Sequence, residues 1–182
     1  MPANNSAAYG LQRAHEAGIP TEILESKNFK DREAYDKALQ KLIDTYSPQF
    51  IILAGFMRIL STFFVEHYAG RILNIHPALL PQFPGLDTHQ KVLIAGIKRH
   101  GATVHFVTEE LDGGPIIAQA SRKVSATDTV ESLSENVLEL EHILYPLVIR
   151  WIAEGRLKLT SEGVLLDNRL LPPQGEQILA PH

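Results

Sequence analysis

The apolar stretch at residues 72–81 contains an amide, Asn74, and an imidazole, His76, two residues apart. Because the side chains of a strand alternate in direction, these two are expected to point to the same side. Pro77 removes a backbone donor and favours the end of the strand at His76. The pattern predicts a donor and a titratable group at one edge of a sheet, where open α/β sheets bind ligands. A capping asparagine and a packed histidine would give the same tripeptide.

A second segment can bring a carboxylate to the same edge. Asp112 lies in Leu-Asp-Gly-Gly-Pro at 111–115, whose glycines and proline indicate a tight loop. A carboxylate beside an imidazole favours its protonated form and fixes its orientation, while an amide N–H can stabilise an oxyanion. Asn74, His76 and Asp112 together would suit acyl transfer, with the histidine as proton donor.

The composition narrows the class of protein. A chain of 182 residues with 45% hydrophobic and 21% charged residues is expected to form one globular domain over residues 1–182. A net charge of −4 predicts no nucleic-acid or membrane partner. The absence of cysteine excludes disulfides and fits a cytoplasmic location. His89 and His105 lack metal-ligand spacing, so no metal is expected, and His105 is expected to line a pocket or pack.

Strands and helices alternate along the chain. Strands are expected at 21–24, 50–54, 72–75, 103–107 and 115–124, and helices at 7–18, after Asp31, through Val92 to Gly101, and after Asp128. This order predicts an α/β fold of three layers around a mostly parallel sheet. Asp128 and Glu131 have capping-box spacing, and Pro146 is expected to kink that last helix. Short strands are expected at 158–160 and 164–166, followed by a loose end from Pro172.

Three segments resemble phosphoribosylglycinamide formyltransferase, a folate-dependent family of purine biosynthesis. They are Ala-Gly-Phe-Met-Arg-Ile-Leu at 54–60, Asn-Ile-His-Pro-Ala-Leu-Leu-Pro at 74–81, and His-Gly-Ala-Thr-Val-His-Phe-Val-Thr-Glu-Glu-Leu-Asp-Gly-Gly-Pro at 100–115. The resemblance covers nearly the whole chain and implies the Rossmann-like formyltransferase fold. It also implies formyl transfer from the co-substrate 10-formyltetrahydrofolate to the amine of glycinamide ribonucleotide, without a metal, by a monomer or weak homodimer.

The resemblance assigns roles to individual residues. His76 resembles the catalytic proton donor, Asn74 the group that holds the formyl oxygen, and Asp112 the carboxylate that supports the histidine. The resemblance also implies folate contacts. They are assigned to Asn74, to the loop residues Met57, Arg58, Ile59 and Leu60, and to the basic residue Arg32. Glu141 resembles a contact to the ribose of the nucleotide substrate.

The front of the chain departs from the family. Family members carry roughly thirty more residues there, the size of a βαβ unit with its first strand and a glycine-rich phosphate loop. We therefore expect the sequence to be an N-terminally shortened form of a longer chain. Two other functions stay open: a formyltetrahydrofolate deformylase, which would pass the formyl group to water, and a non-catalytic folate-binding remnant.

Overall fold

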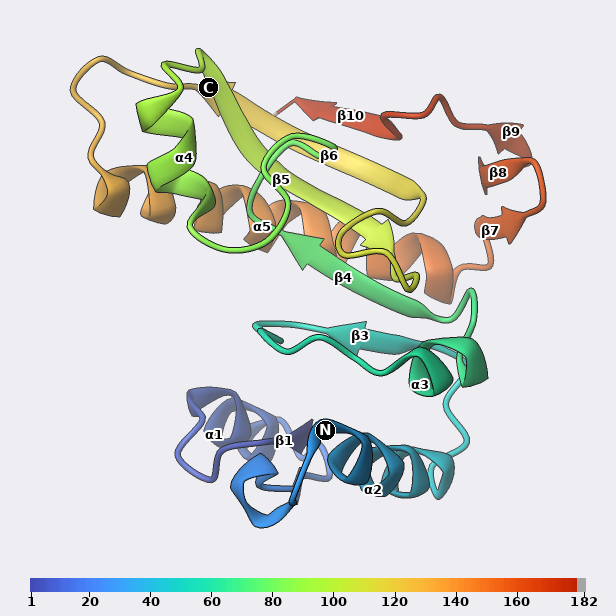
Figure 1. Ribbon diagram of the computed structural model, residues 1–182. Coiled ribbons are helices and arrows are strands. Elements are labelled where there is room, and N and C mark those ends of the chain that lie inside the picture. The colour runs from blue at the N-terminus through green and yellow to red at the C-terminus, as the bar shows by residue number, and fades with distance from the viewer. Residues whose placement is uncertain (180–182) are drawn as a thin grey trace. The chain divides into compact units, whose positions relative to one another are not determined.

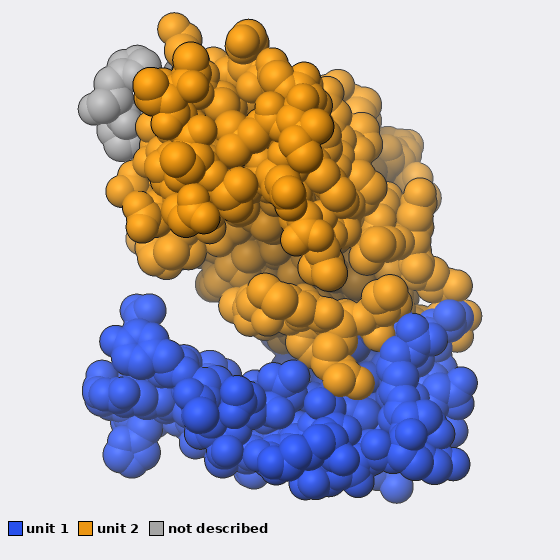
Figure 2. All heavy atoms as spheres, turned by 60° about the vertical axis from the view of Figure 1, so that its left-hand side comes forward, with its two compact units in different colours: residues 1–49, 60–64 blue, residues 50–59, 65–182 orange. Residues whose placement is uncertain are grey.

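The computed structural model describes residues 1–179, which fall into two compact units (Figure 2). Unit 1 comprises residues 1–49 and 60–64, and unit 2 comprises residues 50–59 and the chain from residue 65 onward. The short helix α3 (Thr62–His67) contains residues of both. A single domain over residues 1–182 stays a prediction.

Unit 1 contains two helices and a short pair of parallel strands. Its elements are β1 (Pro2–Ala3), α1 (Tyr9–Glu16), β2 (Glu22–Ile23), a 3-10 turn (Ser26–Asn28) and α2 (Arg32–Asp44). The side chain of Asp31 accepts a hydrogen bond of 2.8 Å from the N–H of Ala34, so it caps α2 as expected. The buried carboxylate of Asp36 accepts the N–H of Ser61 at 2.7 Å and thereby ties residues 60–64 to α2.

Unit 2 is organised around a five-stranded mixed sheet (Figure 1). Its strands, in spatial order, are β10 (Glu176–Leu179), β6 (Ile116–Lys123), β5 (Arg99–Phe106), β4 (Ile72–His76) and β3 (Ile51–Leu53). The α/β class and the end of β4 at His76 are confirmed. The sheet is mixed: β3, β4, β6 and β10 run in one direction, and β5 runs antiparallel to both of its neighbours, β4 and β6. Residues 107–115, which join β5 to β6, are too few for a parallel crossover.

The long helix α5 (Val130–Ala153) covers one face of this sheet, which we call the apolar face (Figure 1). Alternate residues of three strands point to this face and are buried: Leu73, Ala102, Val104, Phe106, Ala118 and Ala120. They form one hydrophobic cluster with α5 residues such as Val137, Leu144 and Val148. Burial of this apolar stripe against the sheet is the main source of stability in unit 2.

The opposite face, which we call the polar face, carries the remaining alternate residues. Residues paired across neighbouring strands share a face, and the pairs here are Asn74 with His105, His76 with Thr103, and Thr103 with Gln119. All but Asn74 are at most 5% exposed. Polar side chains are buried at such positions only when they find hydrogen-bond partners, so each of these residues is expected to have one.

The start of α5 differs from the sequence prediction by one residue. Thr129 and Ser132 form the capping box: the Thr129 hydroxyl accepts the N–H of Ser132, and the Ser132 hydroxyl accepts the N–H of Thr129. The expected box of Asp128 and Glu131 is therefore wrong, because the carboxylate of Asp128 accepts the N–H of Ser125 in the preceding turn. Pro146 lies inside α5, which continues to Ala153.

The C-terminal part adds a small sheet and an edge strand. β7 (Leu157–Thr160) and β8 (Gly163–Leu166), both expected, pair with β9 (Arg169–Leu170). The expected loose end from Pro172 is wrong up to residue 179, since β10 pairs in parallel with β6 and Leu171 is buried. The remaining helix, α4 (Thr88–Ile94), precedes β5. Among residues 1–179, none of the helices has the length and apolar character needed to cross a bilayer.

Candidate active site

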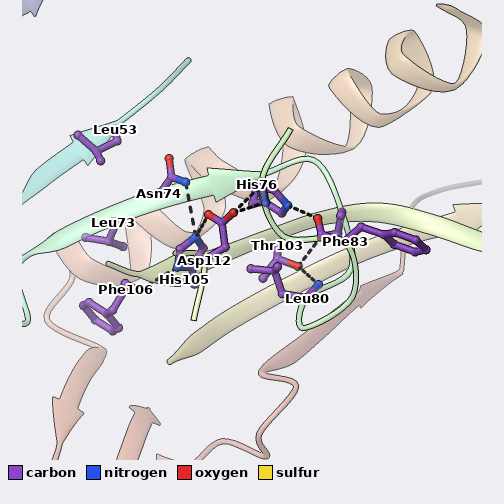
Figure 3. A network of polar contacts seen from close by, with 12 residues as sticks. Leu53, Leu73, Asn74, His76, Leu80, Phe83, Thr103, His105, Phe106 and Asp112 are labelled. Atoms are coloured by element: carbon purple, nitrogen blue, oxygen red, sulfur yellow. Dashed lines mark hydrogen bonds and ion pairs between the residues drawn. The ribbon is translucent and has the colours of Figure 1, made fainter. Parts of the chain in front are cut away.

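Strand β4 places Asn74 and His76 side by side on the polar face, as the alternation predicted (Figure 3). His105 lies opposite Asn74 on β5, and its side chain is 2% exposed. The Nδ2 atom of Asn74 and the Nε2 atom of His105 are 3.5 Å apart. An amide and two imidazoles therefore share one small region of the sheet, and only the amide is partly exposed.

The β5–β6 loop brings Asp112 to these side chains (Figure 3). Its Oδ2 lies 3.4 Å from Nδ1 of His76, and its Oδ1 lies 3.7 Å from Nε2 of His105. The Oδ2 atom also accepts the N–H of Gly85 at 2.8 Å. The structure thus brings together the three residues that the sequence singled out, and the carboxylate lies between two histidines.

The backbone of this loop explains its glycines and the orientation of Asp112. Asp112 has a φ of 52°, in the left-handed region that aspartate tolerates better than most residues. A Cβ atom on Gly114 would collide with the carbonyl oxygen of Phe106, so the loop returns past the end of β5 backbone against backbone. Gly114 is therefore required where the loop brings the carboxylate back onto the sheet.

The ring of His76 faces an oxygen acceptor at each nitrogen. Its Nε2 lies 2.9 Å from the carbonyl oxygen of Phe83, and its Nδ1 faces the carboxylate of Asp112. A neutral imidazole carries one N–H, whereas the imidazolium carries two and can donate to both oxygens. The surroundings of His76 therefore match the protonated ring, which is the form that can act as a general acid.

His105 is matched to the opposite protonation state. Its Nδ1 donates to the carbonyl oxygen of Phe106 at 2.9 Å, which leaves Nε2 as the acceptor for an N–H of Asn74. Burial lowers the pKa of His105, which keeps the ring neutral at neutral pH. His105 thus orients the amide nitrogen of Asn74. The sequence alone predicts only that His105 lines a pocket or packs. Its position two residues after Thr103 on one strand is the signal that places both side chains on the same face.

A second pair of histidines lies near the start of β5. Nδ1 of His89 and Nε2 of His100 are 3.0 Å apart, and burial lowers the pKa of His100 to about 4. His100 lies two residues before Ala102 on β5, so its side chain points to the apolar face. Within residues 1–179, no group of three or more His, Asp or Glu side chains is arranged to hold a metal ion.

The predicted binding residues lie in three places. The loop after β3 exposes Met57 and Ile59 strongly, while Arg58 and Leu60 are partly buried. On α5, burial raises the pKa of Glu141, a carboxylate with no hydrogen bond or ion pair within the described chain. Arg32 is the exposed first residue of α2 and belongs, like Leu60, to unit 1, whereas the three predicted catalytic residues belong to unit 2. All these binding roles stay predictions.

Comparisons with known proteins agree on one family. Residues 2–149 match the sequence model of the Formyl transferase family. Phosphoribosylglycinamide formyltransferase of Escherichia coli (strain K12) is 54% identical over 173 residues, which are 95% of this chain and 82% of that protein. The solved phosphoribosylglycinamide formyltransferase of Coxiella burnetii superposes with a TM-score of 0.91 at 48% identity, over 97% of this chain and 83% of that one.

A hydrolase shares the fold at lower similarity. The formyltetrahydrofolate deformylase of Pseudomonas syringae pv. tomato superposes with a TM-score of 0.82 at 28% identity. The match covers 91% of this chain but 54% of that one. The Coxiella burnetii transferase therefore resembles this chain more closely than the deformylase does in sequence, in structure and in length.

Proposed function

We propose that this chain, which belongs to the formyl transferase family, transfers a formyl group from 10-formyltetrahydrofolate to the amine of 5'-phosphoribosylglycinamide in de novo purine biosynthesis. The observation that carries the proposal is the convergence of Asn74, His76 and Asp112 on the polar face, with the carboxylate 3.4 Å from the imidazole. The lack of cysteine fits a cytoplasmic location.

The proposed reaction assigns each group one task. The substrate amine bonds to the formyl carbon, and the carbonyl electron pair moves onto oxygen, where an N–H of Asn74 stabilises the charge. The carbon–nitrogen bond to folate then breaks as the carbonyl re-forms, and His76 donates a proton to the departing nitrogen. The attacking amine, which became cationic, releases one proton. Asp112 stabilises the imidazolium before the transfer and orients the ring.

The neutral state of His105 supports the role of Asn74. Because Nε2 of His105 accepts one N–H of the amide, the nitrogen end of Asn74 is directed by the protein, and its second N–H is free for a substrate oxygen. An amide turned the other way would present its oxygen, which cannot stabilise an oxyanion. This geometry favours acyl transfer, in which negative charge develops on a carbonyl oxygen.

Binding roles extend the proposal beyond the catalytic groups. We assign folate contacts to Asn74 and to the loop residues Met57, Arg58 and Ile59 of unit 2, while the folate contacts implied for Leu60 and Arg32 lie on unit 1 and stay predictions. We assign the ribose of the nucleotide to Glu141, whose partly buried carboxylate lacks a protein partner within the described chain. A carboxylate without a protein donor is available to accept a hydrogen bond from a ribose hydroxyl.

One assay separates the transferase from its two alternatives. The purified chain is incubated with 10-formyltetrahydrofolate, with and without 5'-phosphoribosylglycinamide, and the formylated nucleotide and free formate are quantified. A transferase gives formylated nucleotide and releases formate slowly or not at all. Formate produced at the same rate without the nucleotide would identify a deformylase and contradict the proposal.

Folate binding is measured on the same preparation by calorimetry. Binding without formylated nucleotide or formate would identify a non-catalytic remnant and overturn the proposal as well. The Asn74→Ala variant is the internal control, because it removes the amide donor while leaving the histidine and the carboxylate in place. We expect it to lower kcat roughly a hundredfold, the usual cost of one oxyanion donor.

A further inference from the structure

We infer that Gln119 and Thr103, neither of which forms a hydrogen bond with Asn74 or Asp112, act as positioning residues for His76 by holding the backbone loop that accepts its ring proton. The inference rests on the proposed function, since that function makes the orientation of His76 matter for turnover. Both residues are almost completely buried, Thr103 at 0% and Gln119 at 5% exposure.

The two side chains belong to a polar row that runs across the sheet. The register pairs His76 with Thr103, Thr103 with Gln119, and Gln119 with Gln177, so the row crosses β4, β5, β6 and β10. Directly paired residues point to the same face. Small apolar residues would fill such positions without the need for partners. The row instead uses hydroxyl and amide groups whose hydrogen bonds all have identifiable targets.

Thr103 is the centre of these contacts (Figure 3). Its hydroxyl donates to the carbonyl oxygen of Ala78 at 2.7 Å and accepts the N–H of Leu80 at 3.1 Å. It also accepts an N–H from the amide of Gln119 at 2.9 Å. One hydroxyl has one donor and two acceptor positions, so its capacity is fully used.

Gln119 completes the attachment of the same backbone. The second N–H of its amide donates to the carbonyl oxygen of Leu80 at 2.8 Å. Thr103 and Gln119 therefore hold three backbone groups of residues 77–85, which we call the 77–85 loop. Ala78 and Leu80 are at most 2% exposed, so water does not replace these contacts readily.

The far end of the 77–85 loop determines where the catalytic pair lies. The carbonyl oxygen of Phe83 accepts the Nε2 proton of His76 at 2.9 Å, and the N–H of Gly85 donates to Asp112 at 2.8 Å. The loop thus contacts both members of the pair, and its middle is fixed to the sheet by Thr103 and Gln119. A loop released from the sheet would leave the ring of His76 free to turn.

Two matched pairs of variants test this inference. Thr103→Val removes the hydroxyl at nearly constant shape, whereas Thr103→Ser keeps it. Gln119→Leu removes the buried amide, whereas Gln177→Leu removes an exposed amide that donates to the oxygen of Gln119 at 3.4 Å and forms no hydrogen bond with the 77–85 loop. Each variant is assayed for kcat, for KM of both substrates and for Tm. Its His76 ring N–H exchange is followed by nitrogen-15 NMR.

We expect Thr103→Val and Gln119→Leu to lower kcat about tenfold or more with KM nearly unchanged, because a small misplacement of a catalytic group is costly. The Nε2 proton of His76 should exchange faster in both. Thr103→Ser and Gln177→Leu should match the parent. An unchanged kcat and exchange rate in folded Thr103→Val and Gln119→Leu would overturn the inference, as would equal losses in the control variants.

The inference can still be tested if Gln119→Leu does not fold or if the parent protein gives no turnover. If Gln119→Leu does not fold, Gln119→Asn keeps a polar amide but withdraws it by one methylene, and the same loss of kcat and faster exchange are expected. If the parent itself gives no turnover, the proposed function has failed, and the exchange measurement alone decides. Faster exchange then supports the attachment of the 77–85 loop, and unchanged exchange rejects it.

Discussion

The two faces of the five-stranded sheet are buried to a similar degree but by different means. On the apolar face, Leu73 and Val104 are 0% exposed against α5, where close packing and removal of apolar surface from water stabilise the fold. On the polar face, Thr103 and His105 are at most 2% exposed, yet each is held by directed hydrogen bonds. Alternation along the same strands produces both environments.

The difference shows where the chain carries its chemistry. A buried polar group adds little stability even when it is paired and costs about 1–3 kcal/mol when its partner is lost. A face built from Asn74, His76 and His105 is therefore a poor way to stabilise a sheet. We propose that the apolar face maintains the fold and that the polar face carries the catalytic groups, and substitutions on the two faces should separate these properties.

The largest effect is expected for His76→Ala on the polar face. Loss of the proton donor should lower kcat roughly a thousandfold or more, while folate binding measured by calorimetry stays close to that of the parent. The matched control is His15→Ala, which removes an exposed imidazole on α1 and should leave kcat unchanged. Full activity of His76→Ala would reject its assigned role.

Asp112→Asn should have the next largest effect. The substitution keeps an oxygen that can accept the N–H of Gly85 but removes the charge that faces His76. We expect kcat to fall about a hundredfold to a thousandfold, since the proton donor loses its stabilising carboxylate. Steady-state kinetics across the pH range checks this, and a loss of binding with kcat intact would contradict it.

On the apolar face, Leu144→Ala should lower stability and leave kcat unchanged, the reverse of the effect expected on the polar face. Leu144 is 0% exposed in the cluster formed with the sheet, so its truncation should lower the free energy of unfolding by about 2–5 kcal/mol. The kcat of the folded fraction should be preserved. Urea unfolding measures the change, and Ile143→Ala, at a position 43% exposed on the same helix, is the control and should be nearly neutral. A large loss of kcat in folded Leu144→Ala would contradict the division of roles.

The smallest effect concerns the titratable residue of the apolar face. Burial lowers the pKa of His100 to about 4, below the ordinary 6.5, so the unfolded chain takes up this proton before the folded protein does. The free energy of unfolding should therefore fall as the pH decreases from about 6.5 towards 4. His100→Gln should flatten this decrease by an amount on the order of 1–2 kcal/mol.

Urea unfolding at pH 7 and pH 5 measures that contribution. The control is His142→Gln, which removes an exposed imidazole on α5 and should leave the pH dependence as it is in the parent. An identical pH dependence in the parent and in His100→Gln would show that the buried histidine does not contribute.

The sequence predicted those parts of the site that depend on local periodicity. The spacing of Asn74 and His76 predicted that both side chains lie on one face of the sheet, and Pro77 predicted the end of β4. The glycines after Asp112 indicated a tight loop, which the close approach of Gly114 to Phe106 explains. The family resemblance then supplied the reaction, which the comparisons support.

The sequence could not give features that depend on which strands pair. The antiparallel direction of β5 decides that Thr103 lies beside His76 and Gln119, and no local pattern encodes that choice. The addition of β10 to β6 likewise depends on a free strand edge, so the segment after Pro172 resembled a loose end. The capping box was misplaced because Thr129 and Asp128 are both good caps and only the turn at Ser125 decides between them.

In the proposed reaction, the carbonyl oxygen of Phe83 competes with the substrate nitrogen for the proton that His76 donates. A substrate nitrogen must be more attractive to that proton than a backbone carbonyl 2.9 Å away. The formyl-bearing nitrogen of intact folate is amide-like and attracts a proton weakly, but it becomes an ordinary amine once the tetrahedral intermediate has formed. We expect the backbone contact to delay protonation until the acceptor amine has added, and thereby to protect the co-substrate from wasteful breakdown.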